Sequence, residues 1–245
     1  MKFIGVDLGW SSGASGLCCL QWQDQTLKIL ELTTILDLDD ILAWIDRQTS
    51  NSPALIAIDA PTIITNPTGM RLCDRLTHKH FGRYHAGCYP ANLGLKFASR
   101  TTGFSQSLIA RGFQHAPEIE PQKLGRYQIE VFPHPATINL FGLDKILKYK
   151  KGRLAERRME LNKLRGHIVK TLPKLEPAVS SSTLKLIPTI AHRSTGKELK
   201  AIEDRLDSII CAYVAAHWWY WGTAKNMVLG NAESGFIVIP AASNR

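Results

Sequence analysis

The sequence predicts an α/β fold in which helices flank a mixed five-stranded sheet, with three antiparallel strands followed by parallel ones. Three observations support this fold class. Three short apolar segments separated by turns open the chain, two later apolar segments carry acidic residues at or near their ends, and segments of helical periodicity lie between and after them. We expect residues 1–245 to form a single domain, with residues 62–125 inserted after the fourth strand.

The antiparallel part of the sheet is expected at the N-terminus. The apolar run at residues 2–7 predicts a first strand that ends on Asp7. Residues 16–22 and 26–32 follow as the second and third strands, and the polar residues between them form a turn. Three consecutive strands with short turns indicate an antiparallel meander.

The parallel part of the sheet is expected from two later segments. Residues 38–48 have helical spacing and lead to a continuous apolar run at 54–58, which is typical of a strand buried on both faces. That run is followed at once by Asp59. Residues 127–132 form the fifth predicted strand, with Glu130 near its end.

Helical periodicity recurs through the rest of the chain. The insertion is expected to contain helices within 67–81 and around 103–114. Residues 145–174 predict an amphipathic helix with a strongly basic outer face and an apolar stripe that begins at Leu154. The most regular pattern spans 197–221, and residues 227–240 predict a closing hairpin.

The composition restricts the classes of protein to which the chain can belong. It has 30 Lys and Arg against 21 Asp and Glu, a net charge of +9, which suits a polyanionic partner such as nucleic acid. The five cysteines are odd in number and form no C-x-x-C pair, which favours a reducing compartment. Since no apolar run is long enough for a leader or a membrane span, we expect a cytoplasmic protein without a membrane partner.

Acidic residues mark the places where chemistry is expected. Asp7 and Asp59 end strands that would place their carboxylates roughly 5 Å apart if the strands are neighbours. Carboxylates this close repel one another unless a cation lies between them, and oxygen ligands select Mg²⁺ or Mn²⁺. The candidates are Asp7, Asp59, Glu130, Asp204 and Asp207, of which the last two lie three residues apart on one side of the 197–221 helix.

Each acid also has a structural explanation. Asp7 could cap the turn that follows it, and Asp59 before Ala-Pro could form an Asx turn. Glu130 could be a charge on an edge strand, and Asp204 could stabilise the start of its helix through the helix dipole. Asp207, on an otherwise apolar helix, is the hardest to explain in this way.

Five segments of the sequence, taken in their order along the chain, resemble those of a known superfamily. They are IGVDLG (4–9), AIDAP (57–61), RLCD (71–74), IEVFPHP (129–135) and EDRLDSIICAYVAA (203–216), and they span nearly the whole chain. In these segments the chain resembles the RNase H-like superfamily, and within it the RuvC-like nucleases. It is most similar to the uncharacterised domain-of-unknown-function proteins considered to be RNase H-like nucleases.

The resemblance implies an RNase H-like sheet and a metal-dependent nuclease that hydrolyses phosphodiester bonds of DNA or RNA. Asp7 would bridge two Mg²⁺ or Mn²⁺ ions, Asp59 and Asp207 would each hold one, and a water activated there would attack phosphorus in line. Asp204 matches a companion acid one turn earlier, a further metal ligand. Glu130 matches a Glu-x-x-Pro of the predicted nucleases and is a further catalytic candidate.

Basic residues are expected to contact the phosphates of the nucleic acid. A solvated helix face is the simpler explanation for the run of charge at 145–174, although eleven basic residues against two acids exceed what solubility requires. The candidates for substrate binding are Arg71, Lys150, Lys151, Arg153 and Arg157.

Two other functions compete with the nuclease. A phosphotransferase of the sugar-kinase and actin-like class also begins with a strand ending in Asp-x-Gly, and Ser11-Ser12-Gly13 could hold phosphate, but the chain lacks a second Asp-x-Gly and an adenosine loop. A catalytically inactive nucleic-acid-binding module is the third possibility. The spacing of Cys73, His78, His80, His85 and Cys88 matches no common zinc site, and Trp218 to Trp221 are expected to pack rather than stack on bases.

Overall fold

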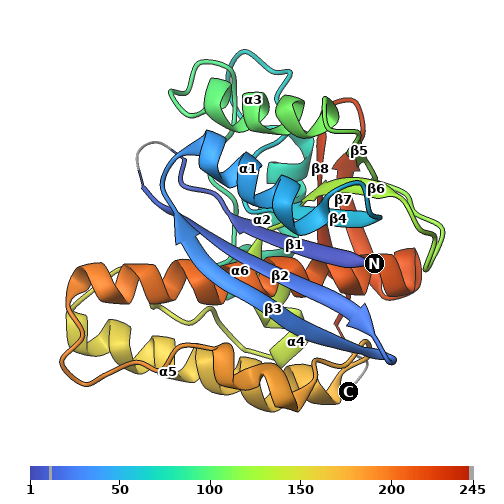
Figure 1. Cartoon of the computed structure of the whole chain (residues 1–245). Coiled ribbons are helices and arrows are strands. Elements are labelled where there is room, and N and C mark those ends of the chain that lie inside the picture. The colour runs from blue at the N-terminus through green and yellow to red at the C-terminus, as the bar shows by residue number, and fades with distance from the viewer. Residues whose placement is uncertain (11–12, 243–245) are drawn as a thin grey trace.

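The computed structural model describes residues 1–10 and 13–242 and shows helices on both faces of a mixed sheet (Figure 1). The sheet has six strands in the order β3-β2-β1-β4-β6-β5. Its strands are β1 (Lys2–Asp7), β2 (Ser15–Gln23), β3 (Thr26–Ile35), β4 (Ala54–Ile58), β5 (Gln114–His115) and β6 (Arg126–Glu130).

The predicted order of antiparallel and then parallel pairing is confirmed. β1 pairs antiparallel with β2, and β2 with β3, whereas β4 runs parallel to β1 and β6 parallel to β4. The prediction of five strands is corrected to six because β5 adds a parallel edge beside β6. A strand of two residues is too short to produce an alternating pattern in the sequence.

Helices cover both faces of the sheet, and a separate hairpin closes the chain as predicted. The helices are α1 (Leu38–Thr49), α2 (Leu72–Phe81), α3 (Ala98–Ile109), α4 (Pro133–Phe141), α5 (Leu154–Thr171) and α6 (Gly196–Trp221). The hairpin consists of β7 (Asn226–Asn231) and β8 (Gly235–Pro240). Within the described residues, no helix is long and apolar enough to cross a membrane.

Alternation along the strands divides the hydrophobic core into two parts. Phe3 packs with residues of α6 and α5 on one face, and Ile4 packs with residues of α1 and α3 on the other. Figure 1 shows α1 and α3 on one side of the sheet and α6 and α5 on the other. Trp218 and Trp219 are buried in the α6 core, as the sequence predicts.

Glycines allow α6 to lie directly against the sheet. A Cβ atom on Gly5 of β1 would collide with the carbonyl oxygen of Ser208, and one on Gly16 of β2 would collide with that of Asp204. The backbones of helix and strands therefore approach more closely than side chains would permit. This contact sets the position of the acidic turn of α6 over the strand that ends in Asp7.

Two helix predictions and the end of one predicted strand need correction. The basic helix begins at Leu154 rather than 145, because the preceding residues form a loop in which Gly152 has a φ of +112°. Leu154 is 41% exposed and does not belong to the buried stripe. Within residues 62–125, the second helix spans Ala98–Ile109, so it begins before the predicted 103 and ends short of the predicted 114. The fifth predicted strand ends at Glu130 rather than at 132, and α4 begins at Pro133, where the missing N–H of proline costs no hydrogen bond.

Candidate active site

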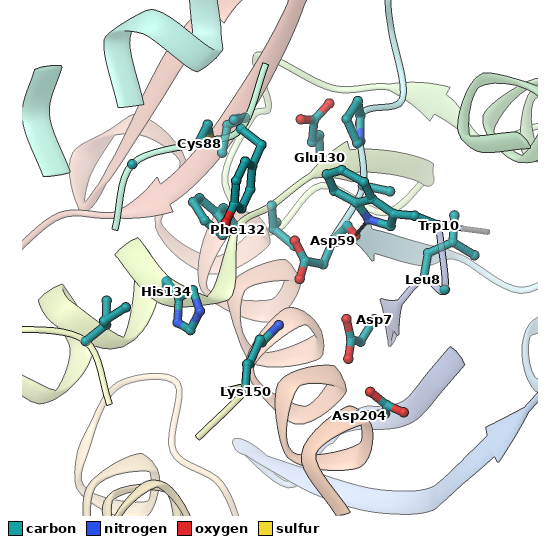
Figure 2. A pocket seen from close by; sticks show the side chains of 18 of the residues that line it. Asp7, Leu8, Trp10, Asp59, Cys88, Glu130, Phe132, His134, Lys150 and Asp204 are labelled. Carbon is teal, nitrogen blue, oxygen red and sulfur yellow. Dashed lines mark hydrogen bonds between the residues drawn. The ribbon is translucent and has the colours of Figure 1, made fainter. Parts of the chain in front are cut away.

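A pocket opens beside the carboxyl end of the parallel strands. Its volume is about 720 Å³. Asp74 of α2 and Glu130 of β6 line it, as do three further acidic residues: Asp7 from β1, Asp59 from the residue after β4 and Asp204 from α6. Figure 2 shows the three carboxylates near Lys150. Asp7 and Asp59, which the sequence placed at strand ends, therefore line the same pocket.

Asp7 and Asp59 lie close together because their strands are paired and because both side chains point to the same face of the sheet. β1 and β4 are adjacent and parallel, and the backbone N–H of Asp59 donates to the carbonyl oxygen of Val6 at 2.8 Å. Both acids continue the alternate positions that face α6, as Phe3 does on β1. Asp7 is 9% exposed, and its Oδ2 is buried without a hydrogen-bond partner among the described residues.

The two acids of α6 have different surroundings. Asp204 lines the pocket. Asp207 is fully buried behind it, where its Oδ1 accepts a hydrogen bond from the hydroxyl of Tyr149 at 2.7 Å. Its Oδ2 lies 2.8 Å from Nζ of Lys150, an ion pair without hydrogen-bond geometry. The structure therefore places Asp204, rather than Asp207, in contact with the open space.

Two lysines neutralise part of this acidic charge. Lys150 comes from the loop before α5 and is one-third exposed. Lys200, one turn before Asp204 on α6, lies 2.6 Å from its Oδ1 and 2.9 Å from Oε1 of Glu203. Burial lowers the pKa of Lys150, but Asp207 and Asp7 outweigh burial and hold it well above its usual value.

Burial and mutual repulsion favour the protonated forms of the acids. Burial raises the pKa of Asp59 to about 7, and Asp207 adds to the shift while Lys150 opposes it. Burial also raises the pKa of Asp7 well above its usual value, again with Lys150 in opposition. The pKa of Asp204 is raised by burial, against a hydrogen bond from Lys200. Additional positive charge in the pocket would therefore stabilise the ionised site.

The donor atoms suit a hard divalent cation, but they are not assembled into a closed ligand cluster. The pocket offers carboxylate oxygens, including the unpartnered Oδ2 of Asp7, and such oxygens are the ligands of Mg²⁺ and Mn²⁺. Among residues 1–10 and 13–242, no group of three or more His, Cys, Asp or Glu is spaced to hold a metal ion. Lys150 and Lys200 supply the positive charge in this arrangement.

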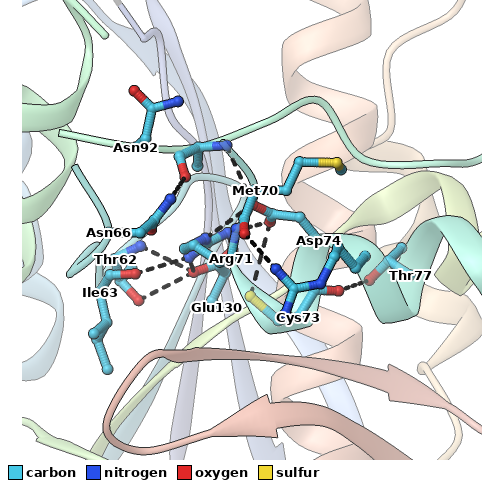
Figure 3. Close-up of polar contacts among 12 residues, drawn as sticks. Thr62, Ile63, Asn66, Met70, Arg71, Cys73, Asp74, Thr77, Asn92 and Glu130 are labelled. Carbon is cyan, nitrogen blue, oxygen red and sulfur yellow. Dashed lines mark hydrogen bonds and ion pairs between the residues drawn. The ribbon is translucent and has the colours of Figure 1, made fainter. Parts of the chain in front are cut away.

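Glu130 belongs to a different network. It pairs with Ile58 on the neighbouring strand, so its side chain points to the face of the sheet opposite to that of Asp59. Its Oε2 and Oε1 accept hydrogen bonds from Nη1 and Nη2 of Arg71 at 2.8 and 2.6 Å. Arg71 also binds Asp74, with Nη2 2.7 Å from Oδ1 (Figure 3). Although burial acts against its charge, Glu130 raises the pKa of Arg71.

The predicted phosphate-binding residues fall into three groups. Lys150 and Lys151 line the pocket, as does the buried and ion-paired Arg71. Arg157 is directed to Glu203, 3.3 Å from its Oε2, and donates to the carbonyl oxygen of Tyr149 at 3.0 Å. Arg153 is exposed at the start of α5. Ser11 and Ser12 of the possible phosphate hairpin lie outside the described residues.

Several pocket residues have no counterpart among the sequence candidates. His134 lines the pocket near Lys150 (Figure 2); burial lowers its pKa to about 4, so its ring is neutral at pH 7. Trp10 and Tyr89 supply aromatic surface. Lys200 is a further such residue. The sequence contained two signals: Lys200 precedes Asp204 by four residues on a helix, and His134 lies in the 129–135 segment.

In the part of the chain that the structure describes, the cysteines and histidines considered for zinc form no group of three that could hold a metal ion. Cys73 is buried, with Sγ 3.8 Å from Oδ1 of Asp74, whereas His85 and Cys88 line the acidic pocket. Burial raises the pKa of both thiols, which keeps them in the neutral form.

Comparisons with known proteins give one match. Residues 5–233 match the family model described as protein of unknown function (DUF429). No curated protein and no solved structure matches the chain.

Proposed function

We propose that this chain, which belongs to the family of proteins of unknown function DUF429, is a metal-dependent nuclease with an RNase H-like fold. One observation carries the proposal. Asp7, Asp59 and Asp204 reach one pocket from two adjacent strands and a helix, and an oxygen of Asp7 is buried there without a partner. Lys150 and Lys200 compensate only part of this negative charge, because the pKa values of Asp7 and Asp59 stay raised, and a divalent cation would compensate more of it.

The fold supports the same proposal. In the RNase H-like superfamily, the acids lie on the first strand, at the end of the fourth strand and on a late helix. This chain has Asp7 on β1, Asp59 after β4 and Asp204 with Asp207 on α6, an arrangement of acids that supports the proposal. Three antiparallel strands followed by parallel strands beside β1 agree with the pattern.

The proposed chemistry assigns a task to each residue. Asp7, Asp59 and Asp204 would hold the ions, with Asp207 behind them. Two Mg²⁺ or Mn²⁺ ions, when bound, would supply Lewis acidity and activate a water for attack on a phosphodiester. Tyr149 and Lys150 hold Asp207 in place, and Lys150 and the exposed Lys151 reach the pocket, where they would contact phosphates of a nucleic acid.

Glu130 has a positioning task in this proposal. Its two carboxylate oxygens are both bound to Arg71, and the backbone N–H of Thr62 donates to its Oε2 at 2.9 Å. The network ties the end of β6 to α2 and to the segment that follows Asp59. Glu130 therefore fixes the wall of the pocket together with Arg71 and Asp74, and leaves the ions to Asp7, Asp59 and Asp204.

The substitution Asp7→Asn tests the nuclease. With Mg²⁺ or Mn²⁺, wild-type protein should cleave labelled DNA or RNA, and the variant should lose at least ~100-fold in rate because it lacks one essential charge. Asp40→Asn, which changes an exposed acid on α1, is the matched control and should cleave normally. Calorimetry should detect two Mn²⁺ ions per wild-type chain. Cleavage that survives Asp7→Asn would refute the proposal.

A further inference from the structure

We propose that the pocket takes a single-stranded segment of nucleic acid, with one base stacked on Tyr89 and its phosphate directed to the acids. This inference rests on the proposed function, because the acids would be the place of phosphodiester cleavage. It names the substrate class of that site and rests on the aromatic residues of the pocket and on its exposed Lys148 and Lys151, none of which the acid cluster explains.

Tyr89 is an exposed aromatic ring at the pocket. It lies in the 62–125 segment, lines the pocket, and leaves 71% of its surface exposed. Nζ of Lys151 lies 6.0 Å from the centre of its ring, so a cation and an aromatic face from distant parts of the chain meet at the pocket. This combination binds a nucleic acid through a base and a phosphate at once.

Trp10 forms a fixed apolar wall beside the acids. Its indole N–H donates to the carbonyl oxygen of Asp59 at 3.2 Å, and its ring lies 4.5 Å from that of Phe97. Figure 2 shows Trp10 and Phe132 on either side of Asp59. A flat apolar ligand would therefore lie against aromatic rings while a group attached to it reaches the carboxylates.

Charge and size select the form of nucleic acid. Lys148 and Lys151 line the pocket, are exposed, and form no ion pair with any residue in 1–10 or 13–242, so both are available to phosphates. A pocket of about 720 Å³ has the size of a small-ligand site. Bases of a duplex are stacked and paired, whereas those of a single strand can be splayed onto aromatic rings.

Binding measured without catalysis tests this inference. Fluorescence anisotropy would compare a labelled single strand with its blunt duplex, as DNA and as RNA, on wild-type protein in EDTA and on Asp7→Asn with Mg²⁺. The single strand should bind more tightly in both settings. Tyr89→Ala should weaken its binding by about 5- to 150-fold, the effect of losing one stacked base. The matched variant Tyr89→Phe keeps the ring and should bind as the parent protein does.

The outcomes separate this inference from the nuclease. Equal binding of single strand and duplex, or equal losses in Tyr89→Ala and Tyr89→Phe, would overturn the single-strand site even if the protein cleaves nucleic acid. Ring-dependent binding of the single strand by a protein that cleaves nothing would support the site and refute the nuclease.

Discussion

Asp59 is an acidic residue whose ionised form is disfavoured by its surroundings. Its backbone is fixed by the hydrogen bond to Val6 and by the one from Trp10. Its carboxyl group lies beside other acids, and burial raises its pKa to about 7, with Asp207 adding to the shift. Ionising the carboxyl group of Asp59 is therefore less favourable in the folded protein than in water.

That cost predicts how stability depends on pH when no divalent ion is bound. A carboxyl group whose pKa is raised in the folded state binds more protons there than in the unfolded chain. The free energy of unfolding should thus fall as the pH rises from about 4, the unfolded value, to about 7, the folded value of Asp59. Urea unfolding in EDTA at pH 5 and 7.5 measures this fall.

The variant Asp59→Asn identifies the source of that pH dependence. Asn cannot ionise, so the fall in unfolding free energy between the two pH values should be smaller than in the wild type. Asp40→Asn, at an exposed position on α1, should leave the fall as it is. A pH dependence that is the same in both variants would contradict the assigned role of Asp59.

At the scale of elements, the contact between α6 and the first two strands decides the site. Gly16 pairs with Asp7 across the sheet. The backbone of Asp204 occupies the space that a side chain on Gly16 would fill. The helix therefore delivers Asp204 to Asp7 by backbone contact rather than through packed side chains. Gly16 therefore helps to determine the position of Asp204 at the pocket.

Gly16→Ala should disturb both stability and the site. The added methyl group meets backbone atoms that cannot rotate away, so we expect a loss of about 1–3 kcal/mol in unfolding free energy, as for other overpacked positions. The rise in melting temperature on adding Mn²⁺, which measures ion binding to the native state, should also shrink. Denaturant and thermal unfolding give both values.

Gly103→Ala is the matched control for that change. Gly103 is an exposed residue inside α3 and a Cβ atom there meets nothing. Alanine should stabilise this helix by roughly 0.5–1 kcal/mol and leave the effect of Mn²⁺ intact. If both variants behaved alike, close contact between α6 and the sheet would not be what places the acids.

At the scale of the whole molecule, the net charge of +9 includes exposed lysines that line an acidic pocket. The pocket itself combines five acidic and five basic residues, because Arg71, Lys148, Lys150, Lys151 and Lys200 face Asp7, Asp59, Asp74, Glu130 and Asp204. Three of these basic residues are committed to ion pairs. Attraction for a polyanion must come from the remaining lysines and from the rest of the surface.

Salt dependence measures that attraction. Each phosphate contact on a single strand contributes about −0.7 to the slope of log K against log salt concentration. Replacing Lys148 and Lys151 together by Gln should reduce the slope by about 1.4, as measured by anisotropy at several salt concentrations. The same replacement at the exposed Lys174 and Lys185, which do not line the pocket, should change it less. Equal effects would argue against phosphate contacts at the pocket.

The sequence by itself determined the elements with strong local patterns. The buried run at 54–58 and the helix at 197–221 appear within one residue of their predicted bounds, because apolar periodicity reports the face that a segment buries. The same reasoning placed Asp7 and Asp59 at strand ends, and the pairing of β1 with β4 in the structure makes those ends neighbours. Sequence patterns did not reveal β5, which is too short, or α4, whose initial prolines resemble a strand stop.

Only the tertiary structure decided which charged groups share the site. Glu130 follows a strand pattern like that of Asp59, yet it pairs with Arg71, 59 residues earlier, because its register turns it the other way. Lys150, predicted on a helix face, comes from a loop to meet Asp207, 57 positions later in the chain. Local periodicity records what each segment buries, whereas such pairings depend on how distant segments pack, which no local pattern contains.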